Sequence, residues 1–334
     1  SGNHDSLGFP EMYFFAPKYL VCGDSAGVEI IIGDRSIIET INKIKLRRNK
    51  NAAPSQTKVN PRITKQAYLE KIEKLKKHIN RGDVYEVNFC QEFFSENATI
   101  DPISLFQELN HISPTPFAGY FKLHDHYILS ATPERFLTKK GNKLISQPIK
   151  GTARRSADPL EDESIKKQLR SSKKEQAENI MIVDLVRNDL TRSAQKGTVK
   201  VEELLGLYSF KQVHQLISTV SCILDGKVHF IDAIKNSFPM GSMTGAPKYR
   251  AMELIEDLEE TKRGIYSGTM GYITPGGDFD LNVVIRSILY NSSTKYLSFQ
   301  VGGAITNASD PENEYNECLV KASAILQVLE GPSE

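Results

Sequence analysis

The sequence has few cysteines, almost no net charge and no long apolar run, and each absence excludes a class of protein. Its four cysteines, Cys22, Cys90, Cys222 and Cys318, are scattered, without the close pairs of a zinc site or the density of a disulfide scaffold. No apolar run reaches the roughly 18 residues that cross a bilayer, and residues 1–10 lack the charged and apolar regions of a signal peptide. We therefore expect a cytoplasmic protein with no membrane partner.

The charges are balanced, with 42 lysines and arginines against 41 aspartates and glutamates and a net charge of +1. Nothing in this balance attracts the chain to nucleic acid or to an anionic membrane. A chain of 334 residues that is 40% hydrophobic can bury a sizeable core, in one large domain or in two ordinary ones. The composition predicts a folded globular protein that binds no nucleic acid.

The N-terminal third predicts a short β segment, a linker and a helix. Aromatic and β-branched residues cluster between glycines in residues 12–33, which is typical of two or three strands. Residues 49–62 are polar and contain prolines, so they predict a linker. An amphipathic helix follows, capped by Thr64 and ended by Gly82. We expect an N-terminal β segment over residues 1–50 and a large domain over residues 64–334.

Strands and helices in the large domain come in runs. Strands are predicted over residues 84–89, 117–123, 127–130, 144–148, 213–224, 268–274, 280–290 and 296–304. Helices are predicted from Asp158 to Asn179, over residues 247–259 and over residues 313–329. Because the order is not a strict βαβ alternation, it favours an α+β architecture with large antiparallel sheets.

A glycine-rich stretch, Gly241–Lys248, leads into one of the predicted helices. It is not a Walker loop, because its spacing is wrong and Pro247 precedes the lysine. The free N–H groups and the dipole at a helix N-terminus favour an anion such as a carboxylate. The pattern is about equally typical of an ordinary capped turn.

Lys150 ends an apolar strand beside Gly151. A lysine in such a position can be desolvated and approached closely by a substrate, which lowers its pKa and frees the amine for nucleophilic attack. On position alone, a surface lysine in a turn is the more common arrangement.

Carboxylates offer a further candidate site. Glu178 lies at the end of the predicted charged helix, and Glu314, Glu317 and Lys321 share one face of the last helix. Mg²⁺ prefers a few carboxylates together with water and the oxygens of its ligand. On spacing alone, exposed charge pairs are more common than a metal site.

Five segments resemble those of the chorismate-binding enzymes and occur in the same order. They are Ser130–Phe136, Pro148–Thr152, Met181–Leu190, Gly241–Lys248 and Val284–Ser287. The resemblance covers about residues 64–330. The family includes the large components of anthranilate synthase and aminodeoxychorismate synthase, and the isochorismate and salicylate synthases. The resemblance implies a fold in which large antiparallel sheets form a sandwich with helices packed outside.

The resemblance also assigns roles to residues. Glu178 and Glu317 match the family's magnesium ligands, with Glu314 as an auxiliary, and Glu134 matches the general acid that protonates the departing C4 hydroxyl of chorismate. The positions that match substrate-binding residues are Gly151, Thr152, Gln215, Ser242, Tyr266, Arg286, Gly302 and Gly303. Arginine suits a carboxylate because its planar fork can bind two oxygens at once.

The family often carries histidine where Gln215 is aligned. Glutamine can donate a hydrogen bond in its place, and if the alignment is off by one residue, His214 fills the role instead.

Lys150 distinguishes between members of the family. The run Pro-Ile-Lys-Gly-Thr is similar to the aminodeoxychorismate synthases, whereas anthranilate synthases usually carry alanine in place of the lysine. The resemblance implies that Lys150 attacks C2 of chorismate with loss of the C4 hydroxyl, and that ammonia then attacks C4 and expels the lysine. We expect the product to be 4-amino-4-deoxychorismate, the precursor of p-aminobenzoate in folate biosynthesis.

Three alternatives remain open. An anthranilate synthase component shares the fold and the substrate. Isochorismate and salicylate synthases use a water-activating lysine in the segment that matches residues 83–93, where this chain has none. A non-catalytic chorismate-binding module is the third, and the presence of Glu134, Lys150, Glu178 and Glu317 weighs against it.

The resemblance implies a partner. No cysteine lies in the Gly-x-Cys-x-Gly turn of a glutamine-hydrolysing nucleophile. Relatives obtain ammonia from a separate glutamine amidotransferase subunit, so we expect one here, with free ammonia as a weaker substitute. Larger relatives carry a longer N-terminal region, which binds tryptophan in anthranilate synthases. Since only about 50 residues precede the linker here, we do not expect regulation by tryptophan.

Overall fold

The structure is a computed structural model that describes residues 2–46, 57–210 and 213–331. The chain divides into two compact units. One consists of Ser1–Phe9 and Ser55–Glu334, and the other of Pro10–Pro54. The first nine residues therefore belong with the large unit and not with the N-terminal β segment in which they were expected.

The small unit contains a β-hairpin and a helix. Strand β1 (Leu20–Gly23) pairs antiparallel with β2 (Val28–Ile32), and α1 (Ser36–Leu46) follows. The hairpin matches the strands predicted within residues 12–33, whereas α1 was not predicted. Much of the predicted linker over residues 49–62 lies outside the described residues.

The large unit is built from two seven-stranded sheets, in which every described strand pairing is antiparallel. The first has the order β12-β4-β16-β15-β6-β5, with β3 beside β4, and the second the order β10-β11-β8-β7-β14-β13, with β9 beside β11. The first sheet contains β3 (Asn60–Pro61), β4 (Glu86–Ser95), β5 (Gly119–Leu123), β6 (His126–Ser130), β12 (Gly245–Ala246), β15 (Ser287–Asn291) and β16 (Tyr296–Ile305). The second contains β7 (Arg135–Lys140), β8 (Lys143–Gln147), β9 (Ile149–Arg154), β10 (Lys200–Ser209), β11 (Val213–Ile223), β13 (Gly271–Ile273) and β14 (Phe279–Asn282).

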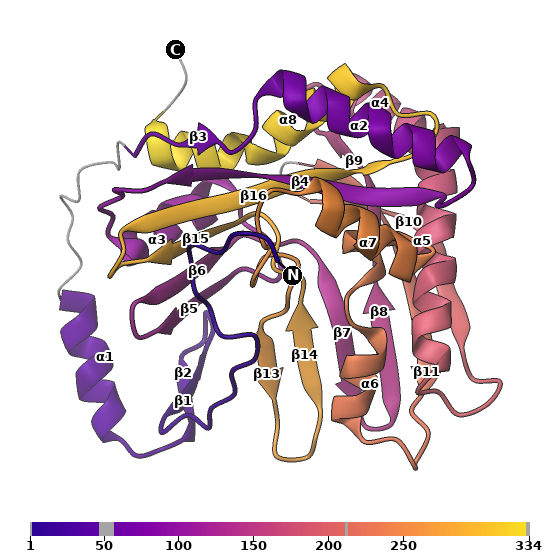
Figure 1. The fold of residues 1–334 in the computed structure, drawn as a ribbon. Helices are drawn as coiled ribbons and strands as arrows, with labels where there is room; N and C mark the ends of the chain where they lie inside the picture. Colours follow the sequence, from indigo (N-terminus) through magenta and orange to yellow (C-terminus); the bar gives the residue numbers. More distant parts are fainter. Residues whose placement is uncertain (1, 47–56, 211–212, 332–334) are drawn as a thin grey trace. The chain divides into compact units, whose positions relative to one another are not determined.

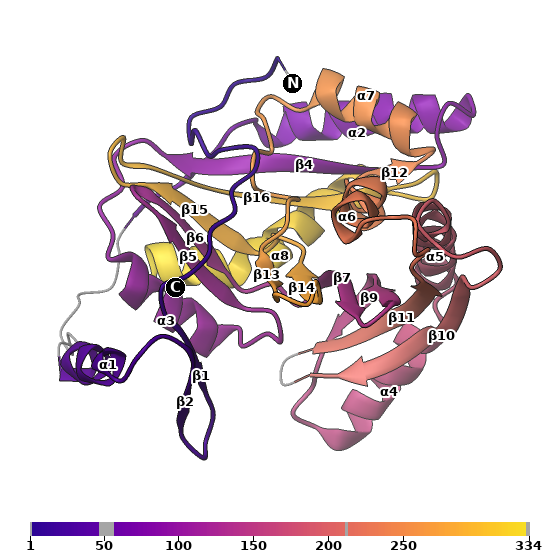
Figure 2. The same ribbon diagram turned by 90° about the horizontal axis from the view of Figure 1, so that it is seen from below.

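Helices cover the sheets. They are α2 (Lys65–Asn80), α3 (Pro102–Ile112), α4 (Pro159–Ser171), α5 (Lys173–Thr191), α6 (Phe230–Ser237), the 3₁₀ turn η1 (Gly241–Met243), α7 (Lys248–Leu258) and α8 (Pro311–Glu330). In Figure 1, α2 and α8 lie over β4 and β16. In Figure 2, α4 and α5 lie beside β10 and β11. Thr64 caps α2 as predicted, its hydroxyl accepting from the N–H of Ala67 at 3.2 Å. None of the helices in the described residues combines the length and the apolar character needed to span a bilayer.

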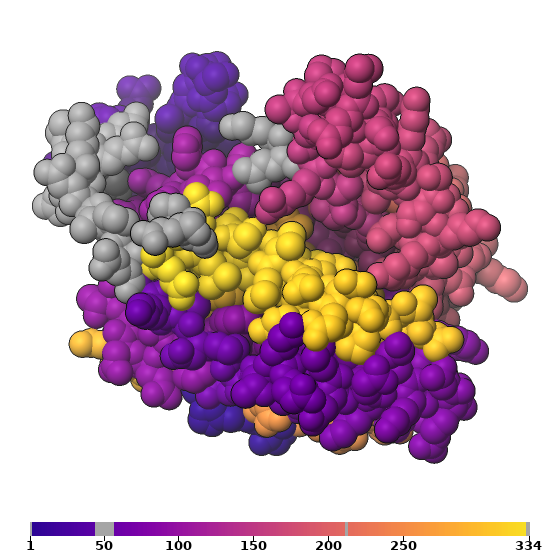
Figure 3. Space-filling view, turned by 90° about the horizontal axis from the view of Figure 1, so that it is seen from above, coloured from indigo at the N-terminus to yellow at the C-terminus, as the bar shows by residue number. Residues whose placement is uncertain are grey.

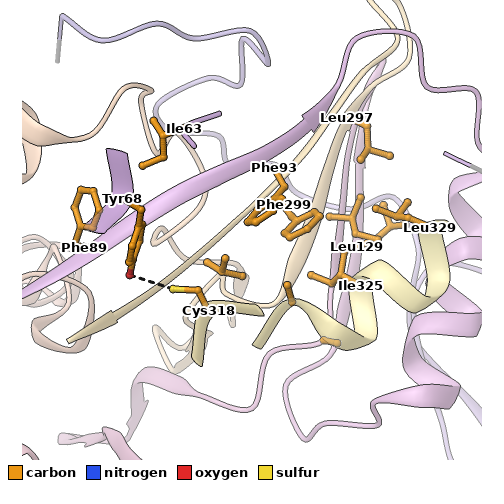
Figure 4. Close-up of a cluster of buried hydrophobic side chains, with 14 of the residues drawn as sticks. Ile63, Tyr68, Phe89, Phe93, Leu129, Leu297, Phe299, Cys318, Ile325 and Leu329 are labelled. Atoms are coloured by element: carbon orange, nitrogen blue, oxygen red, sulfur yellow. Dashed lines mark hydrogen bonds between the residues drawn. The ribbon is translucent and has the colours of Figure 1, made fainter. Parts of the chain in front are cut away.

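Two buried clusters hold the layers together. The first lies between β4, β16 and the helices over them, where Tyr68 from α2 donates or accepts a 3.3 Å hydrogen bond with the thiol of Cys318 on α8 (Figure 4). The second joins the two sheets, with Leu137 and Val220 from one and Leu289 from the other. The expected sandwich of antiparallel sheets with helices outside is confirmed.

The predicted helix from Asp158 to Asn179 is wrong, because the chain forms two helices that meet at Ser172. The hydroxyl of Ser172 accepts from the N–H of Glu175 at 3.4 Å and so caps the second helix. A serine followed three residues later by glutamate is a capping signal that the hydrophobic pattern did not reveal. Glu178 therefore lies within α5 and not at the end of a helix.

The predicted strand over residues 280–290 is also wrong. It is two strands, β14 and β15, which belong to different sheets. The chain crosses between the sheets through residues 283–286, and Arg286 takes a φ of 50° there. The apolar composition continues across the break because both sheets are buried, so the pattern gave no sign of it.

Candidate active site

A cavity of about 830 Å³ lies in the large unit, a volume typical of small-molecule sites. Figure 3 looks onto the hollow between α8, drawn in yellow, and the pink segment that contains α4 and α5. The predicted site residues that line the cavity are Glu134, Lys150, Gly151, Thr152, Glu178, Gln215, Ser242, Tyr266, Arg286, Gly302, Glu314 and Glu317. Gly303 is not among the lining residues, and a side chain there would meet the carboxylate of Glu314.

Lys150 projects from β9, and its side chain is 11% exposed, so it is not a surface lysine in a turn. Its Nζ donates to Oε1 of Glu86 at 3.0 Å. Burial favours a lower pKa for Lys150, but the negative charges of Glu86, Glu178 and Glu134 outweigh it, and the pKa is raised. The expected lowering was wrong because it considered burial without the carboxylates around the amine.

The backbone beside the lysine is held closely against α5. Gly151 has a φ of +93°, and a Cβ there would lie 3.1 Å from the carboxylate of Glu175. The side-chain amide of Asn179 on α5 donates to the carbonyl of Lys150 at 3.3 Å and accepts from Ser218 at 2.5 Å. These contacts fix the position of the lysine relative to the helix that carries Glu178.

Glu134 precedes β7 and is 5% exposed. Burial raises its pKa to about 7, although Ser242, Lys150 and Arg286 act in the opposite direction. A carboxyl group with such a pKa is partly protonated at neutral pH, which is the state that a general acid needs.

Arg286 brings a positive charge to the cavity. Burial of its guanidinium lowers its pKa, with Glu134 opposing. Across the described residues, the guanidinium has neither a hydrogen-bond nor an ion-pair partner. An unpaired buried charge is costly, and a carboxylate on a ligand would complete its bonding. The arrangement therefore fits an anionic substrate.

Two of the three candidate metal ligands share a lysine. Nζ of Lys174 lies 3.9 Å from Oε1 of Glu178 and 3.5 Å from Oε1 of Glu314. Glu317 instead pairs with Lys321 at 2.7 Å, as helical charge pairs often do. In the part of the chain that the structure describes, no group of three or more acidic, histidine or cysteine side chains is placed to hold a metal ion.

Glu178 nevertheless has unmet bonding capacity. Its Oε1 is buried without a hydrogen-bond partner among the described residues, and burial raises its pKa to about 7 against the charge of Lys150. Two carboxylates with room for water and substrate oxygens fit Mg²⁺, which does not need three protein ligands.

Gln215 and His214 lie on opposite sides of β11, as neighbouring residues of a strand do. Gln215 lines the cavity, where its amide donates to the hydroxyl of Thr152 at 3.4 Å. His214 is fully buried on the other side, 2.8 Å from Ser209 and 2.9 Å from Asp162. The alternative in which His214 fills the role of Gln215 is therefore wrong.

The glycine-rich stretch contributes Ser242 and Met243 to the cavity, while residues 245–248 do not line it. The anion site considered at the start of α7 is therefore not part of this cavity. Gly245 has a φ of +149°, and a Cβ there would collide with the backbone carbonyl of Glu86 in β4. Lys248 is bonded to Asp189 and not directed to a ligand.

Several lining or supporting residues were not predicted. Lys174, Glu175 and Gln300 line the cavity, and Glu86 lies behind Lys150. A carboxylate within a strand that is otherwise buried was the available signal for Glu86, since such a charge is rarely buried without a partner.

A family model described as chorismate binding enzyme matches residues 3–327, which is nearly the whole chain. The chain belongs to the chorismate-binding enzyme family. The matched region extends further towards the N-terminus than the motif-based range of about residues 64–330.

Curated relatives include aminodeoxychorismate synthases and an anthranilate synthase component. The chain is 40% identical to aminodeoxychorismate synthase component 1 of Salmonella typhimurium over 80% of this chain and 58% of that protein. It is 39% identical to a probable chloroplastic aminodeoxychorismate synthase of Oryza sativa over 81% of this chain and 30% of that protein. It is 34% identical to anthranilate synthase component 1 of Thermus thermophilus over 98% of this chain and 72% of that protein. The chain thus spans between 30% and 58% of the length of these two aminodeoxychorismate synthases.

Among solved structures, anthranilate synthase component I of Streptococcus pneumoniae superposes with a TM-score of 0.85 at 28% identity. The superposition covers 96% of this chain and 75% of that chain. The sandwich of antiparallel sheets is therefore a fold that this chain shares with an anthranilate synthase component I.

Proposed function

We propose that this chain aminates chorismate at C4 to form 4-amino-4-deoxychorismate. The observation that carries the proposal is Lys150, which lies at a cavity of suitable size with its Nζ bonded to one carboxylate. The aminodeoxychorismate synthase relatives support it. An anthranilate synthase relative supports the fold and the substrate class as well. The resemblance, however, gives alanine and not lysine at the position of Lys150 in anthranilate synthases.

The cavity residues supply the parts that the reaction requires. Lys150 attacks C2 of the ring, and Glu134 in its acid form gives a proton to the departing C4 hydroxyl, which leaves as water. Arg286 binds a carboxylate of chorismate through its unpaired guanidinium. Gly151, Thr152, Gln215, Ser242, Tyr266 and Gly302 complete the proposed substrate-binding set, and Gly303 lies beside the cavity against the carboxylate of Glu314.

Glu178 and Glu314, with Glu317 on the same helix as Glu314, are the residues that would hold Mg²⁺. When bound, the ion supplies positive charge for a substrate carboxylate. When no ion is bound, the positive charge of Lys174, which is close to both Glu178 and Glu314, offsets the repulsion between these two carboxylates.

The ammonia is proposed to come from a separate glutamine amidotransferase subunit. Relatives carry the name component 1, which implies a second component. The product then serves p-aminobenzoate and folate biosynthesis.

The test is a product assay. The purified chain is incubated with chorismate, Mg²⁺ and an ammonium salt, and the products are identified by chromatography and mass. We expect aminodeoxychorismate that requires both Mg²⁺ and ammonium. Anthranilate would instead establish the ortho-aminating reaction, isochorismate formed without ammonium would establish an isomerase, and chorismate binding without turnover would establish a binding module.

A further inference from the structure

The ion pair between Lys150 and Glu86 has an unusual arrangement. Glu86 lies on β4 and is 1% exposed, and its Oε1 accepts the 3.0 Å hydrogen bond from Nζ of Lys150. Its other oxygen, Oε2, is buried without a hydrogen-bond partner in the described residues. Glu86 is not among the residues that line the cavity, whereas Lys150 is. A molecule in the cavity therefore meets the amine, and the carboxylate lies behind it.

The lysine needs a base before it can attack. The carboxylates around it keep Lys150 as an ammonium ion despite its burial, and an ammonium nitrogen has no electron pair to donate. Within the described residues, Glu86 is the one carboxylate whose oxygen lies within 4.0 Å of Nζ. Glu134 and Glu178 influence the lysine through longer distances.

We propose that Glu86 is the general base that takes a proton from Lys150, and the acid that later returns it. This inference rests on the proposed function and deepens it. In the first step, a proton moves from Nζ to Oε1 along their hydrogen bond, which leaves a neutral amine and a neutral carboxylic acid. The geometry suits this transfer because the two atoms are already at hydrogen-bond distance.

The remaining steps balance without a further reactant. The electron pair of Nζ forms the bond to C2, the two ring double bonds shift, and the C4–O bond breaks with a proton from Glu134 to release water. Ammonia then attacks C4, the double bonds shift back, and the C2–N bond breaks with its electron pair returning to Nζ. The new ammonium at C4 gives a proton to Glu134, and Glu86 returns its proton to Lys150.

The surroundings of Glu86 favour the transfer. In a buried site, a neutral pair lies closer in free energy to an ion pair than it does in water, because separated charges are poorly solvated there. Oε2 has no hydrogen-bond donor among the described residues, so no second donor stabilises the charged carboxylate against proton uptake at Oε1. The backbone carbonyl of Glu86 lies against Gly245, which keeps β4 in place beside β12.

The experiment follows the covalent adduct by intact-protein mass after wild type is mixed with chorismate and Mg²⁺ without ammonium. We expect the Glu86→Gln variant to form the adduct, and to turn over with ammonium, about 100-fold more slowly or worse. Its KM for chorismate should stay within about threefold of the wild-type value, because Glu86 does not line the cavity. The Glu86→Asp variant should fall between the two, because the shorter acid keeps a base further from Nζ.

The matched control is Glu92→Gln on the same strand. Glu92 is also buried and pairs with a cation, Arg62, at 3.0 Å, but it does not line the cavity or contact Lys150. We expect its adduct rate to equal that of the wild type. Formate added to a Glu86→Ala variant should restore part of the adduct rate, a response that lost packing would not give.

The proposal is overturned if Glu86→Gln forms the adduct at the wild-type rate, or if it is slowed no more than Glu92→Gln. Should Glu86→Gln not fold, the Asp variant and the formate response decide the question in the same way. A wild type that yields neither adduct nor aminodeoxychorismate would overturn the proposed function itself. If the wild type yields both the adduct and aminodeoxychorismate, and Glu86→Gln forms the adduct at the same rate, only the role of Glu86 as general base is overturned.

Discussion

Two largely buried lysines of the large unit, each paired with a carboxylate, differ in how many of their N–H groups are hydrogen-bonded. Lys150 is 11% exposed and, among the described residues, gives one hydrogen bond, to Glu86. Lys248 is 14% exposed and gives three, two to the oxygens of Asp189 and one to the carbonyl of Pro239. An ammonium group has three N–H donors, so Lys248 is fully satisfied and Lys150 is not.

The difference distinguishes a structural pair from the pair that we propose to be reactive. Burial lowers the pKa of Lys248 with Asp189 opposing, whereas the carboxylates around Lys150 raise its pKa. Only Lys150 lines the cavity. Helix α5 contributes to both places: Asp189 pairs with Lys248, and Glu178 lies near Lys150.

The largest effect should come from Lys150→Met. We expect aminodeoxychorismate formation to fall by at least about 1,000-fold, because the nucleophile is lost and neighbouring groups cannot replace it. Product chromatography with mass detection measures the change. If the variant keeps activity within tenfold of the wild type, Lys150 does not take part in the reaction and no longer differs from Lys248 in this respect.

The matched change, Lys248→Met, should act on stability instead. It leaves Asp189 as a buried charge without its partner, which costs about 3 kcal/mol in the free energy of unfolding. Urea unfolding measures this loss, and turnover per folded molecule should be unchanged. A Lys248→Met variant that is as stable as the wild type but inactive would show that Lys248 takes part in the reaction.

Glu134→Gln extends the contrast to pH. Burial raises the pKa of Glu134 from 4.5 to about 7, so the folded state binds the proton more tightly than the unfolded state does. The stability that this proton contributes is present below about pH 4.5 and is lost as the pH rises through about 7, by an amount on the order of 3 kcal/mol. Wild type and variant should therefore unfold alike at pH 4.5, and the variant should be the more stable at pH 8. Melting curves measure both proteins at the two pH values. A difference in melting temperature between wild type and variant that does not change with pH would contradict a raised pKa for Glu134.

Arg286→Gln should have the smallest of these effects. It removes the unpaired cation of the cavity, and a hydrogen bond to a charged group contributes about 1.5–3 kcal/mol. We expect the KM for chorismate to rise by about 10- to 100-fold with little loss of stability. Steady-state kinetics measures the change, and a variant that loses stability without a change in KM would place Arg286 with Lys248 among the structural residues.

Local pattern predicted most elements of the large unit but not their breaks. The cap at Thr64, the strand that became β11 and the last helix follow from short-range propensity and periodicity. The break at Ser172 depends on one capping hydrogen bond, and the crossing at residues 283–286 lies inside an apolar run that is buried on both sides. Periodicity carries no information about which sheet a strand joins.

The sequence by itself determined the antiparallel α+β architecture, the membership of the chorismate-binding family and a set of site residues of which all but Gly303 line the cavity, because motifs and patterns are properties of neighbours along the chain. Only the tertiary structure decided the direction of the pKa of Lys150, the choice of Gln215 over His214 and the structural role of Lys248. Glu86 is 64 residues from Lys150 in the chain and 3.0 Å from it in space. Electrostatic and hydrogen-bond energies depend on the second distance, and the sequence states only the first.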